Sequence, residues 1–363
     1  MYRNLAILAG AFIVGVAVAT LYYVFETALH ESINVLWYEW FNTGTVRGLV
    51  FPLAITLSFI YFGLADLSGS KSFSSEVGLG HMPKPSLQNL VLVLLVGYFS
   101  LLAGAVLGPE AILVPASMIV GALAGRLYSN HTASEALIAA AIIALFAAFF
   151  KSVIVGFISV LLVTQQTKSR INLKLILIAI IASASSYLTL RLLSGRAYVQ
   201  FPKISYAVNG KTLLFCLTLV FAGYILIRLM KLCLSLLLKV FETFKLHAWW
   251  ARAVMGSLVI TLLYLLGGNL VEFTGNLSII PLFNQAKTLG YVGILWIVFI
   301  KTLLISWSKA AGYIGGMIFP TIFLASALVA LVVLMYPGFN LLYGLLAVLV
   351  GAFTANRKTR VLV

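Results

Sequence analysis

The chain has 363 residues, of which 62% are hydrophobic and only 9% are charged, and its mean hydropathy is +1.10. So few charged side chains cannot cover the surface of a soluble protein of this length. The formal net charge of +15 does not indicate nucleic acid either, because Lys and Arg stand mainly near the ends of apolar stretches, as in membrane proteins.

Apolar stretches long enough to cross about 30 Å of hydrocarbon recur along the whole chain. We predict about eleven membrane segments, at residues 4–29, 46–66, 88–107, 110–128, 134–164, 172–194, 212–240, 250–272, 289–306, 313–336 and 338–355. No polar stretch of domain size separates these segments or follows residue 355. The sequence therefore predicts an all-α polytopic protein of the cell membrane. We expect one transmembrane domain over residues 1–363, embedded in the lipid bilayer, without a cytoplasmic regulatory domain.

Glycine and proline interrupt the apolar sequence at three places, residues 77–83, 104–115 and 312–320. In lipid, backbone that leaves the helix must be buried in protein or line a wet cavity. A helix that begins at such a break presents N–H groups and the positive end of its dipole inside the membrane, and both favour an anion. The alternative for each break is that glycine serves close helix packing and proline only kinks a helix. The second and third breaks also resemble each other and fall in opposite halves of the chain, which is typical of structural repeats around one central site.

Glu110 is the ionisable residue that stands out. It follows Gly108-Pro109 directly, inside an apolar stretch that runs from Leu87 to Leu127. An ionisable group at that depth is costly and is a functional candidate by default. In the first turn of a helix its charge would be stabilised by the helix dipole, so it would occupy the position that an anion prefers. The simple alternative is a carboxylate that only caps the helix.

Side chains for other chemistry are scarce. The chain has 4 His and 2 Cys, without a metal-binding spacing or a HExxH pattern. We expect Cys216 and Cys233 to be buried thiols rather than a disulfide. Lys151, Lys301 and Lys309 stand in apolar surroundings, and we expect each to snorkel or to mark a membrane boundary rather than to bind a ligand. The sequence thus predicts neither an enzyme nor a protein that needs a metal or cofactor.

The three breaks resemble the signature motifs of the CLC family of chloride channels and chloride/proton antiporters. The family motifs Gly-Ser-Gly-Ile-Pro, Gly-(Lys/Arg)-Glu-Gly-Pro and Gly-X-Phe-X-Pro correspond in order to Gly78-Leu-Gly-His-Met-Pro83, Gly108-Pro-Glu-Ala-Ile112 and Gly316-Met-Ile-Phe-Pro320. Weaker matches at 139–156, 275–281 and 300–308 extend the resemblance over about residues 4 to 358.

The resemblance implies a CLC-type inverted repeat of tilted and broken membrane helices, assembled as a homodimer in which each subunit has its own pore. It implies that Glu110 is the external gate, which competes with chloride for the outer site. The backbone N–H groups that follow Glu110, together with those near Ile318 and Phe319, would be the anion ligands. The residues so assigned to anion binding are Gly78, Leu79, Gly80, Gly108, Pro109, Ala111, Ile112, Leu113, Gly316, Met317, Ile318, Phe319 and Pro320.

Several departures from the family pattern bear on the mechanism. Leu79 replaces the serine that donates its hydroxyl to the anion, and Pro109 replaces a basic residue. The family's internal proton-transfer glutamate is absent, since Leu162 and Val163 stand in its place. The chain also ends where the family continues through two further helices, so we expect a domain without them or a fragment.

We therefore expect passive transport of chloride or a similar small inorganic anion, gated by Glu110. Chloride/proton antiport is one alternative, and a non-transporting protein or fragment with the CLC fold is another. A third is an unrelated transporter of organic anions, for which only Lys151, Lys301 and Lys309 would supply fixed cations. We expect no nucleic-acid partner.

Overall fold

The computed structural model describes residues 2–39, 50–68, 84–128, 131–167, 172–202, 210–244 and 248–357. Within these ranges the chain forms helices joined by loops, and its one isolated β-bridge joins Gly108 to Gly316. The chain divides into two compact units. The first unit comprises residues 1–43, 71–98 and 110–199, and the second comprises 44–70, 99–109 and 200–363.

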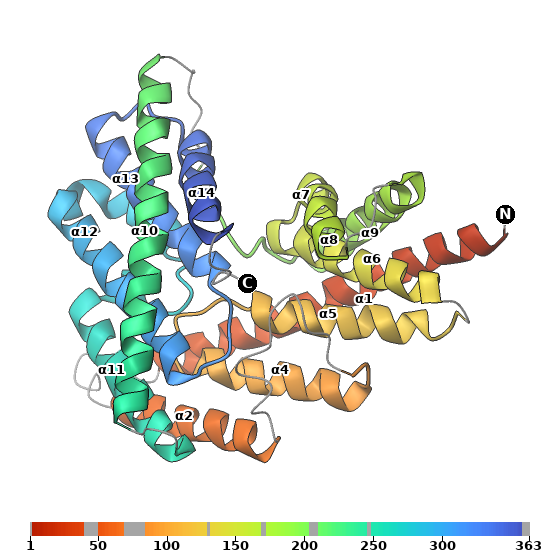
Figure 1. The fold of residues 1–363 in the computed structure, drawn as a ribbon, viewed down its shortest axis with the longest axis horizontal. Helices are drawn as coiled ribbons and strands as arrows, with labels where there is room; N and C mark the ends of the chain where they lie inside the picture. The colour runs from red at the N-terminus through yellow and green to blue at the C-terminus, as the bar shows by residue number, and fades with distance from the viewer. Residues whose placement is uncertain are drawn as a thin grey trace. The chain divides into compact units, whose positions relative to one another are not determined.

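The first unit is built around α6. Its described helices are α1 (Tyr2–Ile33) with a π-helical turn (Asn34–Glu39), most of α4 (Leu87–Leu102), α5 (Glu110–Gly125), α6 (His131–Phe150), α7 (Val153–Ile158), α8 (Val160–Thr167) and α9 (Leu173–Leu192). Helix α6 packs against α1, α5 and α9, and α1 also packs along α9 (Figure 1). Small residues allow these close approaches, because a Cβ on Gly121 would lie 2.6 Å from the Leu137 carbonyl oxygen.

The predicted segment 134–164 is three helices rather than one. Its first break falls at Lys151, whose φ of 46° lies in the left-handed region. The following residue, Ser152, is the N-cap of α7, and its hydroxyl accepts from the N–H of Val155. The Lys151 ammonium donates to the carbonyl of Gly195 at 2.7 Å. A broken stretch in the middle of an apolar segment is therefore held by a lysine and a serine rather than by glycine or proline.

The second unit contains the longer helices. It comprises α2 (Val50–Leu67), the residues of α4 from Phe99, α10 (Gly210–Thr243), α11 (Trp249–Gly267), a 3₁₀ turn (Asn269–Val271), α12 (Ile279–Ala311), α13 (Ile318–Met335) and α14 (Leu341–Arg357). Helix α10 runs along α14 and α12, α13 packs between α12 and α14, and α11 packs on α2 and α12 (Figure 1). An apolar core that includes Val329 and Phe339, both fully buried, fills the space between α10, α13 and α14.

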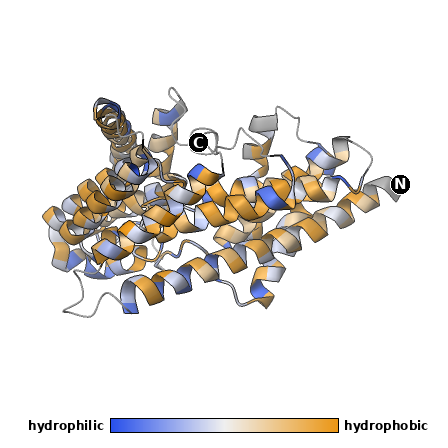
Figure 2. Cartoon of the chain, turned by 90° about the horizontal axis from the view of Figure 1, so that it is seen from below, coloured by the Kyte–Doolittle hydropathy of each residue, from blue (hydrophilic) through white to orange (hydrophobic). Residues whose placement is uncertain are grey.

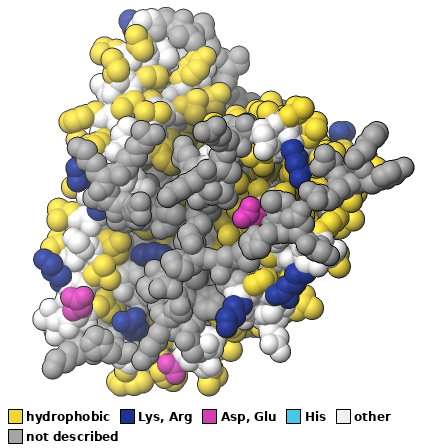
Figure 3. Space-filling model, turned by 45° about the vertical axis from the view of Figure 1, so that its right-hand side comes forward, with side chains coloured by type: hydrophobic (Ala, Val, Ile, Leu, Met, Phe, Trp, Pro, Cys, Tyr) yellow, Lys and Arg dark blue, Asp and Glu magenta, His cyan; other side chains and the backbone are white. Residues whose placement is uncertain are grey.

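The helices are apolar enough to span a bilayer. Eight of them have the required length and hydropathy, and three shorter apolar helices, α4, α5 and α14, accompany them among the described residues. Each predicted segment coincides with at least one of these eleven helices. Hydrophobic colour runs along most of the ribbon in Figure 2, and the described side chains visible in Figure 3 are mostly apolar with scattered Lys and Arg. The protein is therefore a multi-pass integral membrane protein.

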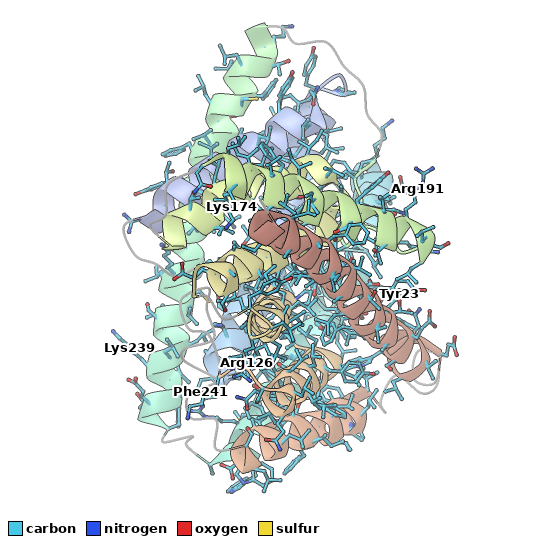
Figure 4. All side chains as sticks on the ribbon, turned by 90° about the vertical axis from the view of Figure 1, so that its right-hand side faces the viewer. Tyr23, Arg126, Lys174, Arg191, Lys239 and Phe241 are labelled. Carbon is cyan, nitrogen blue, oxygen red and sulfur yellow. The ribbon has the colours of Figure 1, made fainter. Side chains whose placement is uncertain are left out.

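Basic residues lie at helix ends in part only. Lys174 and Arg191 lie at the two ends of α9, where basic anchors of membrane helices are typically found (Figure 4). Arg228 and Lys231 lie inside α10, so the expectation that Lys and Arg stand near the ends of apolar stretches is wrong for these two residues. Helix α10 has 34 residues and is about 51 Å long, which exceeds the hydrocarbon thickness. Apolar residues flank both charges within the helix, and Lys231 donates to the carbonyl of Ala355 at 3.0 Å.

The two cysteines lie on one helix, α10. Both are free thiols, as predicted, but they are half-buried rather than buried. Seventeen residues along an α-helix separate two side chains by about 25 Å, which excludes a disulfide between Cys216 and Cys233.

Candidate functional site

Two of the three glycine-rich breaks are paired within the second unit. The N–H of Gly108 donates to the carbonyl of Gly316, and the N–H of Gly316 donates to the carbonyl of Gly108, both at 2.7 Å. Helix α5 begins at Glu110 and α13 begins at Ile318, each two residues after its paired glycine. The prediction that these breaks lead directly into helices is therefore confirmed. The structure also joins the two breaks to each other.

The segment that precedes Glu110 is irregular and buried. Residues 103–109 are all buried, and several of their backbone polar groups bond to residues of the same unit. The N–H of Val106 donates to the hydroxyl of Ser308 at 3.0 Å, and the hydroxyl of Thr274 donates to the carbonyl of Leu107 at 2.7 Å. In a membrane protein such bonds replace those that water would supply, so the non-helical path is stabilised at depth.

The loop before α13 is held in the same way. The hydroxyl of Ser100 donates to the carbonyl of Ile314 at 2.7 Å and accepts from the N–H of Ile314 at 2.9 Å. The hydroxyl of Tyr61 donates to the carbonyl of Gly312 at 2.7 Å. Residues from α2 and the end of α4 thus fix the backbone of the third break, just before its motif.

Glu110 is the first residue of α5 and is buried, with 6% of its surface exposed. Its predicted place in the first turn of a helix is confirmed, and the positive end of the helix dipole stabilises a carboxylate there. Ile112 and Leu113 in the same first turns are fully buried, and Ile112 packs against Gly97 of α4. The gating role of Glu110 stays a prediction.

The predicted anion-binding residues fall into three groups. Gly108, Pro109 and residues 111–113 lie at the start of α5, and residues 316–320 lie at the start of α13. Gly78, Leu79 and Gly80 of the first motif lie outside the described residues. The structure therefore connects the second and third motifs through the glycine pair.

The three apolar-segment lysines differ in their surroundings. Lys301 is fully buried, so the expectation that it snorkels or marks a boundary is wrong. Its ammonium instead donates to backbone carbonyls of the turn after α11. Lys309 and Lys151 are half-buried, and Lys309 makes a long hydrogen bond of 3.4 Å to the carbonyl of Gly315.

Several polar residues at this site lie outside the three signature motifs. Ser100, Tyr264, Thr274 and Ser308 are all buried and each bonds to backbone in or beside a break. Their sequence signal is a hydroxyl side chain within or beside an apolar helix. As for metals, no group of three or more His, Cys, Asp or Glu side chains is suitably placed in the part of the chain that the structure describes.

The model of a known family, described as voltage gated chloride channel, matches residues 51–356. The chain belongs to this CLC family. The resemblance noted in the three motifs is thereby confirmed, and anion transport is the function that membership of the family supports.

Solved structures of CLC proteins have the same fold. A slow cyanobacterial Cl⁻/H⁺ antiporter matches with a TM-score of 0.79 at 16% identity, over 97% of this chain and 95% of that chain. A CLC-type fluoride/proton antiporter matches with a TM-score of 0.66 at 17% identity, over 97% and 87% of the two chains. A eukaryotic CLC transporter matches with a TM-score of 0.64 at 15% identity, over 99% and 73%. The predicted fold class is therefore confirmed. A search of curated proteins found no match to the sequence.

Proposed function

We propose that this CLC protein is a passive, gated pathway for chloride or a similar small inorganic anion. Backbone N–H groups at the starts of α5 and α13 bind the anion, and Glu110 is the gate. The observation that carries the proposal is the Gly108–Gly316 pair, because each helix begins two residues after one of these glycines.

Helix starts suit an anion for two physical reasons. The first N–H groups of a helix have no partner within the helix, and the dipole places positive charge at the same end. A carboxylate in that first turn has the same preference as a dissolved anion. Glu110 is buried there, so its charged form competes with the anion and its protonated form does not.

Passive transport is favoured by the residues in α8. A proton path to the inner side needs a titratable group, and Val163 at the expected place is apolar and buried. The second candidate is chloride/proton exchange, because two CLC structures with this fold are proton antiporters. We also propose a homodimer with one pathway in each subunit, to be tested by counting subunits through single-molecule photobleaching in liposomes.

The deciding measurement is chloride efflux from proteoliposomes with simultaneous recording of proton movement. Passive transport predicts chloride efflux that collapses an imposed potential without proton uptake. Proton uptake coupled to chloride efflux at a fixed ratio would overturn the proposal and show that the protein is an antiporter. Absence of flux for chloride, fluoride and nitrate alike would indicate a non-transporting protein with the CLC fold.

A further inference from the structure

Lys301 is a fully buried cation in α12, within the second unit. Its ammonium donates to the carbonyls of Val271 at 2.9 Å, Glu272 at 3.2 Å and Phe273 at 2.6 Å. It also lies 5.0 Å from the ring centre of Phe323. An ammonium has three N–H donors, and three successive carbonyls take them. The ammonium of Lys301 thus makes all of these hydrogen bonds to one backbone turn.

The turn at 271–275 needs such a partner because its backbone is unusual. Phe273 has a φ of 48°, in the left-handed region that a bulky side chain rarely occupies, and Gly275 has a φ of 85°. A conformation of this kind persists only where the surroundings hold it in place. The ammonium of Lys301 donates to the carbonyl of Phe273, and the N–H of Phe273 donates to the hydroxyl of Tyr264 at 2.7 Å.

The same turn reaches the segment that leads to the gate. The hydroxyl of Tyr264, which accepts from Phe273, donates to the carbonyl of Gly104 at 2.7 Å. The hydroxyl of Thr274 donates to the carbonyl of Leu107 at 2.7 Å. Leu107 directly precedes Gly108, so a continuous path of hydrogen bonds and short backbone segments runs from Lys301 to the glycine pair.

We propose that Lys301 is a positioning residue for the anion pathway. It orders the turn at 271–275, and the turn then holds residues 104–107 through Tyr264 and Thr274. The register of the Gly108–Gly316 pair depends on that segment. The effect on transport rests on the function proposed above, whereas the ordering of the pair does not.

A different role for a buried cation would be direct attraction of the anion. The two roles differ in how Lys301 and Thr274 depend on each other. If Lys301 acts through the turn, removing the Thr274 hydroxyl breaks the same path. The effects of the two substitutions on flux are then not additive. If the charge acts directly on the anion, the effects on flux add, because Thr274 has no charge.

The experiment compares Lys301→Met, Thr274→Val and the double variant in nanodiscs. Hydrogen exchange is measured on peptides that contain the amides of Gly108 and Gly316. Each single variant should accelerate exchange about tenfold, with the double variant close to the faster single one. Lys301→Arg, which keeps a charged donor, should restore slow exchange. Thr302→Val is the matched control, because its hydroxyl donates at 2.7 Å within α12 and touches neither the turn nor the pair.

Chloride efflux is then measured on the same variants, and it should fall in parallel with the exchange data. Unchanged exchange in Thr274→Val would overturn the proposal even if Lys301→Met fails to fold. An additive double variant would also overturn it, in favour of direct attraction. If the unmodified protein transports no anion, the proposed function fails. The exchange data still decide whether Lys301 orders the pair.

Discussion

Gly108 and Gly316 bond to each other through both of their backbone N–H and carbonyl groups, at 2.7 Å in each direction. This pairing uses no side-chain atoms, so it tolerates changes in the motif residues around it. The second motif has Pro109 and Ala111, and the third has Ile318, where the family has other residues. Degenerate motifs can therefore keep the geometry that brings both breaks together, provided that the glycines remain.

Replacing Glu110 by Gln tests the gate. The amide copies the shape of the protonated carboxyl group and cannot compete as an anion, so we expect several-fold faster chloride efflux at neutral pH. We also expect the rate to become independent of pH between about 4 and 8, because the amide of Gln does not titrate. Glu135→Gln is the control, because Glu135 is exposed on α6. Identical pH profiles for Glu110→Gln and the unmodified protein would leave Glu110 as a structural helix cap.

Ser100→Ala should destabilise the loop before α13. The substitution removes the hydroxyl that both donates to and accepts from Ile314, at a buried site. Leaving such groups unbonded costs about 1–3 kcal/mol, so the thermal midpoint in detergent should fall by several degrees. Ser235→Ala removes an exposed hydroxyl from α10 and should leave the midpoint unchanged. Equal midpoints for both variants would show that Ser100 does not stabilise the loop.

The sequence was sufficient to predict some of these features for physical reasons. The start of α5 at Glu110 followed from Gly-Pro before it, since proline and glycine end one helix and an acidic residue suits the first turn of the next. The burial of Lys301 was not predictable, because apolar sequence neighbours surround a snorkelling lysine and a buried one alike. Its carbonyl partners come from a turn about thirty residues earlier along the chain.

The sequence also did not predict the break at Lys151 or the pairing of the two glycines. No glycine or proline stands at Lys151, so the apolar pattern predicted one continuous segment. The similarity of the second and third breaks suggested repeats. Pairing between Gly108 and Gly316 depends instead on how the segments around them fold, which a local pattern does not contain. The gating role of Glu110 is a matter of energetics that transport measurements must decide.

Gly315→Ala should disturb the pair itself. A Cβ on Gly315 would overlap Leu107 and would lie 3.2 Å from the carbonyl oxygen of Gly108. Both neighbours belong to the buried segment, so they cannot move aside without cost, and overpacking of this kind costs about 1–3 kcal/mol. We expect a lower thermal midpoint and slower chloride efflux. Gly63→Ala on α2 is the control, because a Cβ there meets nothing within 4 Å and alanine favours a helix. If Gly315→Ala matched this control, the contact would be looser than the structure indicates.

Gly97 and Ile112 provide a test of the first turns of α5. A Cβ on Gly97 would lie 2.5 Å from two side-chain carbons of Ile112, which is fully buried. Gly97→Ala should therefore push Ile112 and cost about 1–3 kcal/mol. Ile112→Ala should cost about 2–5 kcal/mol by leaving a cavity.

In the double variant the new methyl group fills part of the cavity that the lost side chain leaves. Its destabilisation should therefore be smaller than the sum of the two single effects. The check is the thermal midpoint of all four proteins, with chloride efflux on each. Because Ile112 lies two residues after Glu110, we expect efflux in Gly97→Ala to be reduced and in the double variant to be partly restored. If the two single changes in thermal midpoint simply added in the double variant, the two side chains would not be in contact. Helix α5 would then be rotated about its axis relative to this structure.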